Sequence, residues 1–261
     1  MLLAAGLTHA SAQPLASSNF DAGLEGWTVV NWDGSGTPAI PSWHDTGGFP
    51  GGYIRGWDMH GDGFWLAPPT FAGDWSSAYG GSLSYDAFTT YNNWVMNDVY
   101  IVGTNGVTLS FRCSNNPASS WTHFTVPLAA GAGWQYGLHY DTIGPAATEE
   151  QIRAVLAQVA SLRIREEFAY GSDDSGLDNV VLMAGNNPPR PRFNRCWQEA
   201  GLIALTLETL EPGRSYLIEQ KPSAGGVEPW QPALDFVATN STQLLFLPAT
   251  NSASFYRASR L

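Results

Sequence analysis

Aromatic side chains beside polar loop residues are the part of this sequence best suited to bind a ligand. The 261 residues include 11 Trp, 10 Tyr and 12 Phe. Several flank loops rich in Gly, Asp and Asn, as in residues 55–62 (RGWDMHGD) and 91–94 (YNNW). An exposed ring can stack on the C–H face of a sugar while a nearby carboxylate or amide bonds its hydroxyl groups. The candidate ligand-binding residues are Trp43, Trp57, Asp58, His60, Tyr91 and Trp94. For each Trp the alternative is burial, since this residue type is mostly buried wherever it occurs.

Catalytic patterns are missing from the sequence. It has no G-x-S-x-G elbow, no H-E-x-x-H pair and no phosphate loop. Two adjacent acid pairs, Glu166-Glu167 and Asp173-Asp174, could in principle cleave a glycosidic bond. Neighbours in a strand point to opposite faces, however, so the glutamates of a strand cannot converge. We therefore expect a non-catalytic protein with no catalytic residues.

The charge is concentrated in the first part of the chain. Residues 1–185 hold 17 Asp and Glu against 5 Arg, whereas residues 186–261 hold 6 acidic against 7 basic residues. An acidic surface argues against nucleic acid and anionic membranes as partners. It is compatible with Ca²⁺, which takes carboxylate and carbonyl oxygens.

The elements that must position these residues read as short strands. Apolar runs alternate with Gly, Asn, Asp and Pro punctuation, and Asn105-Gly106 is typical of a hairpin turn because both residues tolerate positive φ. Such a pattern predicts an all-β sandwich. The expected strands of the first part are Trp27–Val30, Gly81–Phe88, Val99–Val102, Val107–Phe111, His123–Val126, Leu162–Phe168 and Val180–Leu182.

One short helix interrupts the strands. Thr148 can cap it, and Gln151 three residues later completes a capping box. Ile152, Val155, Leu156 and Val159 then form one apolar stripe. We expect this helix to cover an edge or end of the sandwich.

A linker and a second domain follow. Gly185–Pro191 (GNNPPRP) contains two adjacent prolines, which favour an extended spacer. After it the charge changes sign and a new strand pattern begins, so residues 192–261 are expected to form a small C-terminal β-sandwich. Its expected strands are Ile203–Leu207, Ser215–Glu219, Ala233–Val237, Gln243–Phe246 and Phe255–Ala258.

The N-terminus resembles a shortened export signal. Residues 2–7 are apolar, and Ala10-Ser11-Ala12 has the small-x-small pattern of a cleavage site, although no basic segment precedes it. We expect residues 1–16 to be a signal-peptide remnant or a disordered leader, and the protein to be secreted. No later segment approaches the roughly 20 apolar residues of a membrane span.

Two cysteines, Cys113 and Cys196, fall in the two different parts of the chain. An oxidising compartment permits a disulfide between them, and two separate buried thiols are the alternative.

Motifs spread along residues 17–184 resemble the laminin B (laminin domain IV) module. The resemblance implies a jelly-roll β-sandwich of the galactose-binding-like type, similar to many carbohydrate-binding modules, and an exported protein of bacterial type. Trp27, Trp65 and Trp134 sit in these motifs and are expected in the core. The motifs are Phe20-Asp21, Glu25-Gly26-Trp27, Pro50–Ile54, Trp65–Pro68, Phe71–Asp74, Ala78–Tyr85, Trp121-Thr122, Gly133-Trp134, Gly144–Thr148, Leu162–Arg165 and Gly176–Val180.

The resemblance also implies a structural Ca²⁺ site. In similar jelly-roll modules an acid after the opening Phe and an acid in the closing strand often share the ion, and here these are Asp21 and Asp178. A backbone carbonyl near Gly23 could complete the ligand shell. The alternative is that both aspartates are turn residues bonded to local N–H groups.

The tail is similar to short fibronectin-like modules of bacterial secreted proteins, through Tyr216–Glu219, Trp230 and Phe255–Arg257. Together these features predict a monomeric carbohydrate-binding or matrix-interaction protein whose partner is a polysaccharide or other glycan. A structural or adhesive spacer without a small ligand is the first alternative. A polysaccharide-active enzyme without familiar motifs is the second.

Overall fold

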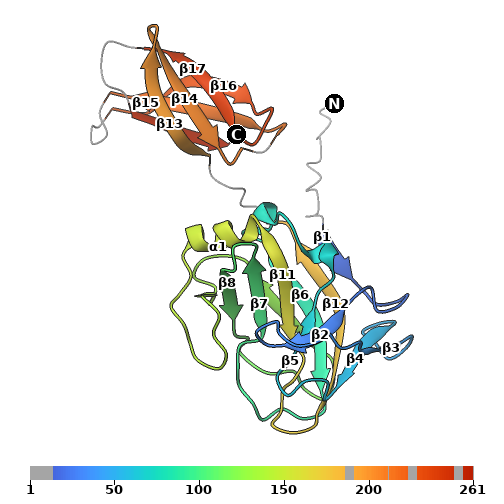
Figure 1. Ribbon diagram of the computed structural model, residues 1–261. Helices are drawn as coiled ribbons and strands as arrows, with labels where there is room; N and C mark the ends of the chain where they lie inside the picture. The colour runs from blue at the N-terminus through green and yellow to red at the C-terminus, as the bar shows by residue number, and fades with distance from the viewer. Residues whose placement is uncertain (1–13, 186–190, 211, 223–227, 250–254, 261) are drawn as a thin grey trace, which may run out of the picture. The chain divides into compact units, whose positions relative to one another are not determined.

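The computed structural model describes residues 14–185, 191–210, 212–222, 228–249 and 255–260. The chain divides into two compact units, Met1–Pro188 and Pro189–Leu261 (Figure 1). Each unit is described by itself below. Residues 1–13 of the expected leader and residues 186–190 of the expected linker lie outside the described residues.

Unit 1 contains two antiparallel sheets. Sheet A has the strand order β3-β4-β12-β6-β9, and β1 also pairs with β12. Its strands are β1 (Pro14–Ser18), β3 (Ser42–His44), β4 (Tyr53–Trp57), β6 (Ser82–Thr89), β9 (Thr122–Pro127) and β12 (Asp174–Met183). The closing strand β12 therefore lies beside the opening strand β1, as in a jelly roll.

Sheet B has the order β10-β8-β7-β11-β5-β2. Its strands are β2 (Thr28–Asn31), β5 (Gly63–Leu66), β7 (Val99–Gly103), β8 (Thr108–Phe111), β10 (Gln135–Tyr136) and β11 (Val159–Arg165). The hairpin between β7 and β8 turns at Asn105-Gly106, as expected, with Gly106 at φ +79°. The Asn105 side chain accepts a hydrogen bond from Val107 N (3.1 Å) and fixes the turn.

The core of unit 1 lies between the two sheets. Trp27, Trp65 and Trp134 are all buried in it, as expected from their motifs. Inward residues of both sheets, such as Ile54 of β4 and Ile164 of β11, complete the cluster. The predicted all-β jelly-roll β-sandwich with one short helix is confirmed.

The helix α1 (Glu149–Leu156) begins where the sequence predicts. Gln151 N donates to Thr148 Oγ1 (3.3 Å), and Thr148 N donates to Gln151 Oε1 (2.9 Å), so the capping box is formed. Ile152, Val155 and Leu156 are buried in the core. Val159 belongs to β11 rather than to the helix. Two short 3₁₀ turns, Pro69–Phe71 and Ser76–Ala78, lie between β5 and β6.

The predicted strand Leu162–Phe168 is wrong at its end. β11 stops at Arg165, because the N–H groups of Glu166 and Glu167 both donate to the Gly63 carbonyl (2.9 and 3.1 Å) instead of following a ladder. The chain therefore leaves strand geometry just before the glutamates. The alternation argument that separated their side chains does not apply.

Unit 2 is a small β-sandwich of two three-stranded antiparallel sheets. One contains β13 (Arg192–Glu199), β14 (Leu202–Glu208) and β17 (Gln243–Pro248). The other contains β15 (Ser215–Lys221), β16 (Gln231–Val237) and β18 (Phe255–Arg260). Side chains from both sheets share one core, including Leu205, Leu207, Tyr216 and Ile218. The sequence did not reveal β13, whose residues are mostly exposed.

Both cysteines are free thiols, and Cys196 is exposed rather than buried. Burial raises the pKa of the Cys113 thiol to about 12, so Cys113 is unreactive at neutral pH. Within the described part of the chain, no helix combines the length and apolarity of a membrane span.

Candidate functional site

Three of the predicted ligand-binding aromatics are exposed and one is not. Trp57 is 68% exposed, Tyr91 57% and Trp43 40%. Trp94 is only 7% exposed, which corrects the expectation of an open ring. Its indole packs under the exposed Tyr170, with ring centroids 4.6 Å apart and nearly parallel planes. Trp94 therefore supports an exposed tyrosine that the sequence did not single out.

The remaining predicted residues lie near the end of β4. Trp57 is the last residue of β4, and Asp58 follows it at φ +47°, accepting a hydrogen bond from Ser172 Oγ (3.0 Å). Part of His60 is buried, and its Nε2 has no hydrogen-bond partner. Trp43 lies on the edge strand β3, opposite Ile54, and its indole N–H donates to the Phe20 carbonyl (2.6 Å). The Trp43 side chain is thus bonded to the backbone.

Sequence reasoning missed an aromatic cluster on the outer face of sheet A. Tyr53, Arg55 and Trp57 alternate with the inward Ile54 and Gly56, so they project from the side away from the core. Four rings on this face pack together. Their centroid separations are 4.9 Å for His44 and Tyr53, 5.9 Å for Tyr53 and Phe88, 5.4 Å for Tyr53 and Trp121, and 4.8 Å for Phe88 and Trp121.

The strand register creates this cluster. Gly176 of β12 stands between Arg55 of β4 and Phe88 of β6. A Cβ at Gly176 would collide with the Phe88 ring, so the glycine leaves room for the aromatic side chain to lie across the sheet. Period-two alternation in the β4 sequence (YIRGW) could have shown that Tyr53, Arg55 and Trp57 share one face. It could not have shown that β4 pairs with β12.

Charged pairs flank the rings. Arg55 makes a bidentate ion pair with Asp174, and its guanidinium lies 5.9 Å from the Trp57 ring centroid. At the other side, His123 Nδ1 lies 2.8 Å from Asp86 Oδ1. This side of sheet A therefore combines exposed ring surface with polar groups in fixed positions. We call it the aromatic face and define it by seven residues, His44, Tyr53, Arg55, Trp57, Phe88, Trp121 and Asp174.

The two aspartates predicted to hold Ca²⁺ accept hydrogen bonds from the same loop, residues 48–52. Asp21 Oδ1 accepts a hydrogen bond from Gly52 N (3.2 Å), and Asp178 Oδ2 accepts one from Phe49 N (2.6 Å). Asp178 is fully buried, which raises its pKa to about 6, and the nearby charges of Asp86 and Asp21 add to the rise. The two carboxylates are therefore close enough to repel, as the sequence argument supposed.

The oxygen atoms around this loop fit a hard cation. A Cβ at Gly48 would collide with Asp178 Oδ2 and with the carbonyl oxygens of Gly51 and Gly52, so these oxygens crowd one place. A donor set of carboxylates and carbonyls is the one Ca²⁺ prefers. Gly23 has open space around its Cα, and the carbonyls that lie near Asp178 are those of Gly51 and Gly52. Asp178 Oδ1 also accepts from Asn179 N (2.7 Å), as the turn interpretation predicted.

A second group of carboxyls is buried with only part of its hydrogen-bonding capacity used. Glu166, Glu167 and Asp173 are almost fully buried, and each has one oxygen with no hydrogen-bond partner. Burial raises the pKa of both glutamates to about 8, and their mutual repulsion and that of Asp173 add to it. Among the described residues, no three acidic, His or Cys side chains are placed to hold a metal ion.

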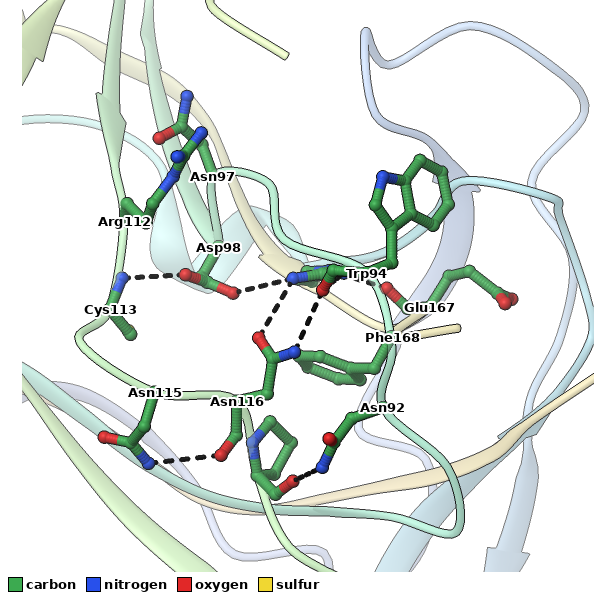
Figure 2. A network of polar contacts seen from close by, with 12 residues as sticks. Asn92, Trp94, Asn97, Asp98, Arg112, Cys113, Asn115, Asn116, Glu167 and Phe168 are labelled. Carbon is green, nitrogen blue, oxygen red and sulfur yellow. Dashed lines mark hydrogen bonds and ion pairs between the residues drawn. The ribbon is translucent and has the colours of Figure 1, made fainter. Parts of the chain in front are cut away.

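Arg165 joins the loops beside these acids, and Figure 2 shows its partners Trp94, Asp98, Asn116 and Glu167 close together. It is 1% exposed, and its guanidinium donates to the carbonyls of Glu167 (2.6 Å) and Trp94 (2.9 Å). It also forms an ion pair with Asp98 (3.3 Å), whose pKa is raised by burial to about 6. One buried cation thus ties its own segment to residues 94–98 and, through Asn116 Oδ1 (3.3 Å), to the loop after β8.

The fold and these residues can now be compared with known proteins. The laminin B (domain IV) family profile matches residues 64–195, and the chain belongs to this family. The L4b domain of human laminin alpha-2 covers 66% of this chain and 98% of its own length at 14% identity, with a TM-score of 0.53. This similarity shows a shared fold and confirms the laminin resemblance. The fibronectin-like resemblance of unit 2 stays a prediction.

Two carbohydrate-binding modules are also similar in structure. The family 11 module of the cellulase Lic26A-Cel5E of Clostridium thermocellum is 19% identical, with 68% of this chain and 96% of that chain covered and a TM-score of 0.43. The tandem CBM22 domain of Xyn10C from Paenibacillus barcinonensis is 10% identical, with 97% and 92% covered and a TM-score of 0.38.

Proposed function

We propose that this chain is an extracellular, non-catalytic glycan-binding protein that uses the aromatic face of sheet A. The observation that carries the proposal is the 68% exposure of Trp57 at the end of a cluster of outward-facing rings. A group of neighbouring rings on the surface, rimmed by polar residues, is typical of an interaction site, whereas a single exposed ring needs no explanation.

The face has the two kinds of contact that sugar recognition needs. Trp57, Tyr53 and Trp121 offer ring surface for the C–H face of a pyranose. The Arg55–Asp174 pair lies beside Trp57 and can exchange hydrogen bonds with hydroxyl groups. The predicted Tyr91 and Asp58 lie in loops that the buried acids hold together, so they would extend the site at this end. Thr89 Oγ1 lies within hydrogen-bond distance of both Asp173 Oδ2 (3.1 Å) and the Tyr91 carbonyl (3.0 Å), and these two acceptors share its one hydroxyl hydrogen.

A structural Ca²⁺ between Asp21 and Asp178 is part of the proposal. The Gly51 and Gly52 carbonyls would complete its oxygen shell, in place of Gly23. The ion would neutralise two carboxylates that otherwise repel, and so hold the 48–52 loop in place. That loop adjoins the aromatic face, because Trp121 Nε1 donates to the Gly47 carbonyl (2.9 Å) and Tyr53 follows Gly52 directly.

Unit 2 would act as a fibronectin-like spacer or attachment module without chemistry of its own. A structural or adhesive role without any sugar is the competing function, and one observation favours it. The rings of the aromatic cluster also pack against each other and could simply cover the sheet.

A glycan array together with pull-down on insoluble polysaccharides tests the proposal. Wild type should retain at least one class of glycan, and Trp57→Ala should reduce the bound fraction about tenfold, which corresponds to about 1.4 kcal/mol. Trp197→Ala is the matched control, since Trp197 is an exposed tryptophan of unit 2. Uniform failure of wild type to bind would favour the structural role. Equal binding by Trp57→Ala and wild type would remove the aromatic face from the account.

A further inference from the structure

A cleft of about 480 Å³ is lined by residues other than those of the aromatic face. One wall is formed by residues 92–96, which lead from β6 of sheet A to β7 of sheet B. The other wall is formed by residues 112–116, which lead back from β8 to β9. The volume is within the range of small-molecule sites, roughly 300–1,000 Å³.

The lining is rich in amides rather than aromatic rings. It includes Asn92, Asn93, Asn115 and Asn116, with Ser114 beside them. Val95, 62% exposed, and Met96 add apolar surface. Amides and hydroxyls can each donate and accept, so together they suit a ligand that carries several hydroxyl groups.

Hydrogen bonds within the protein fix each of three amides and leave further bonding capacity, although Asn115 Oδ1 already accepts from Ser114 Oγ (3.1 Å). Asn92 Nδ2 donates to the Pro117 carbonyl (2.7 Å), so its side-chain oxygen can accept from a ligand. Asn93 Oδ1 accepts from Tyr170 N (2.8 Å), so its amino group can donate. Asn115 Nδ2 donates to the Asn116 carbonyl (3.1 Å) and retains a second N–H. Side chains held in this way lose little entropy when a ligand binds.

The buried Arg165 bonds to both walls of the cleft, at Trp94 and Asn116, and Figure 2 shows these two residues facing each other. Its Nη2 donates to the Trp94 carbonyl (2.9 Å), and its Nη1 donates to Asn116 Oδ1 (3.3 Å). Asn116 Nδ2 also donates to the Trp94 carbonyl (2.9 Å), which joins the two walls directly. A rigid cleft is therefore built into the edge of the sandwich by a residue that itself has almost no exposure.

The charge of the lining points to an uncharged ligand. Its charged side chains are Asp98 and Arg112, one of each sign. The charges of these two lining groups cancel, and Arg112 also donates to the Asp141 carbonyl. The remaining positive charge belongs to Arg165, which pairs with Asp98 and is only 1% exposed, so the lining itself offers a strongly charged ligand no surplus of opposite charge.

We propose that this amide cleft is a second sugar-binding site, which takes one neutral sugar unit at a glycan end through hydrogen bonds. Asn92, Asn93 and Asn115 form hydrogen bonds with the hydroxyl groups of the sugar. Val95 and Met96 contact the C–H face of its ring. The inference rests on the proposed glycan-binding function but concerns different residues. The aromatic face stacks on sugar rings, whereas the cleft selects by hydrogen bonding.

NMR titration of the ¹⁵N-labelled full chain tests both sites separately. The probes are methyl β-glucoside, methyl β-galactoside and N-acetylglucosamine at millimolar concentrations, then the best oligosaccharide from the array. Side-chain amide signals of Asn92, Asn93 and Asn115 report the cleft, and indole signals of Trp57 and Trp121 report the aromatic face. We expect at least one probe to move the asparagine signals saturably. The double variant Asn93→Ala/Asn115→Ala should weaken that response at least tenfold.

The control is Asn240→Ala, which removes an exposed asparagine of unit 2 and should change neither set of signals. If the indole signals move and the asparagine signals never do, the cleft proposal is overturned and the proposed function stands. If only the asparagine signals move, the cleft stands and the aromatic face fails. If the double variant binds as tightly as wild type although its melting temperature is unchanged, the assignment of these amides is wrong.

Discussion

The aromatic face of unit 1 differs from its buried layer, the name used here for Arg165, Asp98, Glu166 and Glu167, in how charged groups are paired and covered. On the aromatic face the ions are paired at the surface, as in Arg55 with Asp174, and apolar ring area is left open. In the buried layer the apolar side chains cover the Arg165–Asp98 ion pair, while among the described residues Glu166 and Glu167 form no ion pair with a cation. Surface pairs contribute little to stability, whereas buried charges are costly when they lose a partner. The difference indicates that substitutions on the aromatic face cost little folding stability, whereas the buried layer holds the loops in place.

Replacing the buried cation should have the largest effect. Arg165→Met leaves Asp98 buried without its ion pair and frees the carbonyls of Trp94 and Glu167, so we expect a loss of about 3–5 kcal/mol of unfolding free energy. Arg55→Met on the aromatic face should cost about 1 kcal/mol or less. Urea unfolding followed by circular dichroism measures both. If both variants lost the same unfolding free energy, the proposed difference between the buried layer and the aromatic face would be wrong.

Stability of unit 1 should fall as pH rises from about 4.5 to 8. Burial raises the pKa of Glu166 and Glu167 from 4.5 to about 8, so within this window the folded state holds more protons than the unfolded state. Each group contributes a slope of up to about 1.4 kcal/mol per pH unit. Urea midpoints measured between pH 5 and pH 9 should therefore decrease, and Glu166→Gln should flatten the decrease. A midpoint independent of pH in wild type would contradict the raised pKa values.

Calcium should stabilise the loop next to the aromatic face. At a free concentration one hundred times the Kd, the ion would add about 2.7 kcal/mol, or a shift of about 5–10 °C in the melting temperature of unit 1. EDTA should reverse this shift, and Asp178→Asn should be insensitive to both additions. The transition of unit 2 is the internal control. A melting temperature unaffected by Ca²⁺ and EDTA would leave Asp21 and Asp178 as turn residues.

Much of the fold could be read from local patterns. The capping box at Thr148, the turn at Asn105-Gly106 and the core positions of Trp27 and Trp65 depend on neighbours a few residues away or on burial of a large ring. Such features can be predicted from one sequence because each depends on the local preference of a residue type, and these preferences agree with the fold.

The candidate site was harder to predict because it depends on register and on distant partners. Phe88 and Trp121 join Tyr53 only because β4, β12, β6 and β9 lie side by side. Trp94 is buried because Tyr170, from another loop, covers it. Glu166 and Glu167 share one buried region because β11 ends at Arg165, where a carbonyl of β5 captures both N–H groups. None of these pairings leaves a periodic trace in the sequence.

Isothermal titration calorimetry with the best array glycan tests the central claim most directly. Trp57→Ala should weaken the affinity of wild type about tenfold with no change in unfolding free energy beyond about 0.5 kcal/mol, because an exposed ring supports little of the fold. Trp197→Ala should bind as wild type does. Unchanged affinity in Trp57→Ala, or an equal loss in Trp197→Ala, would contradict glycan binding by the aromatic face.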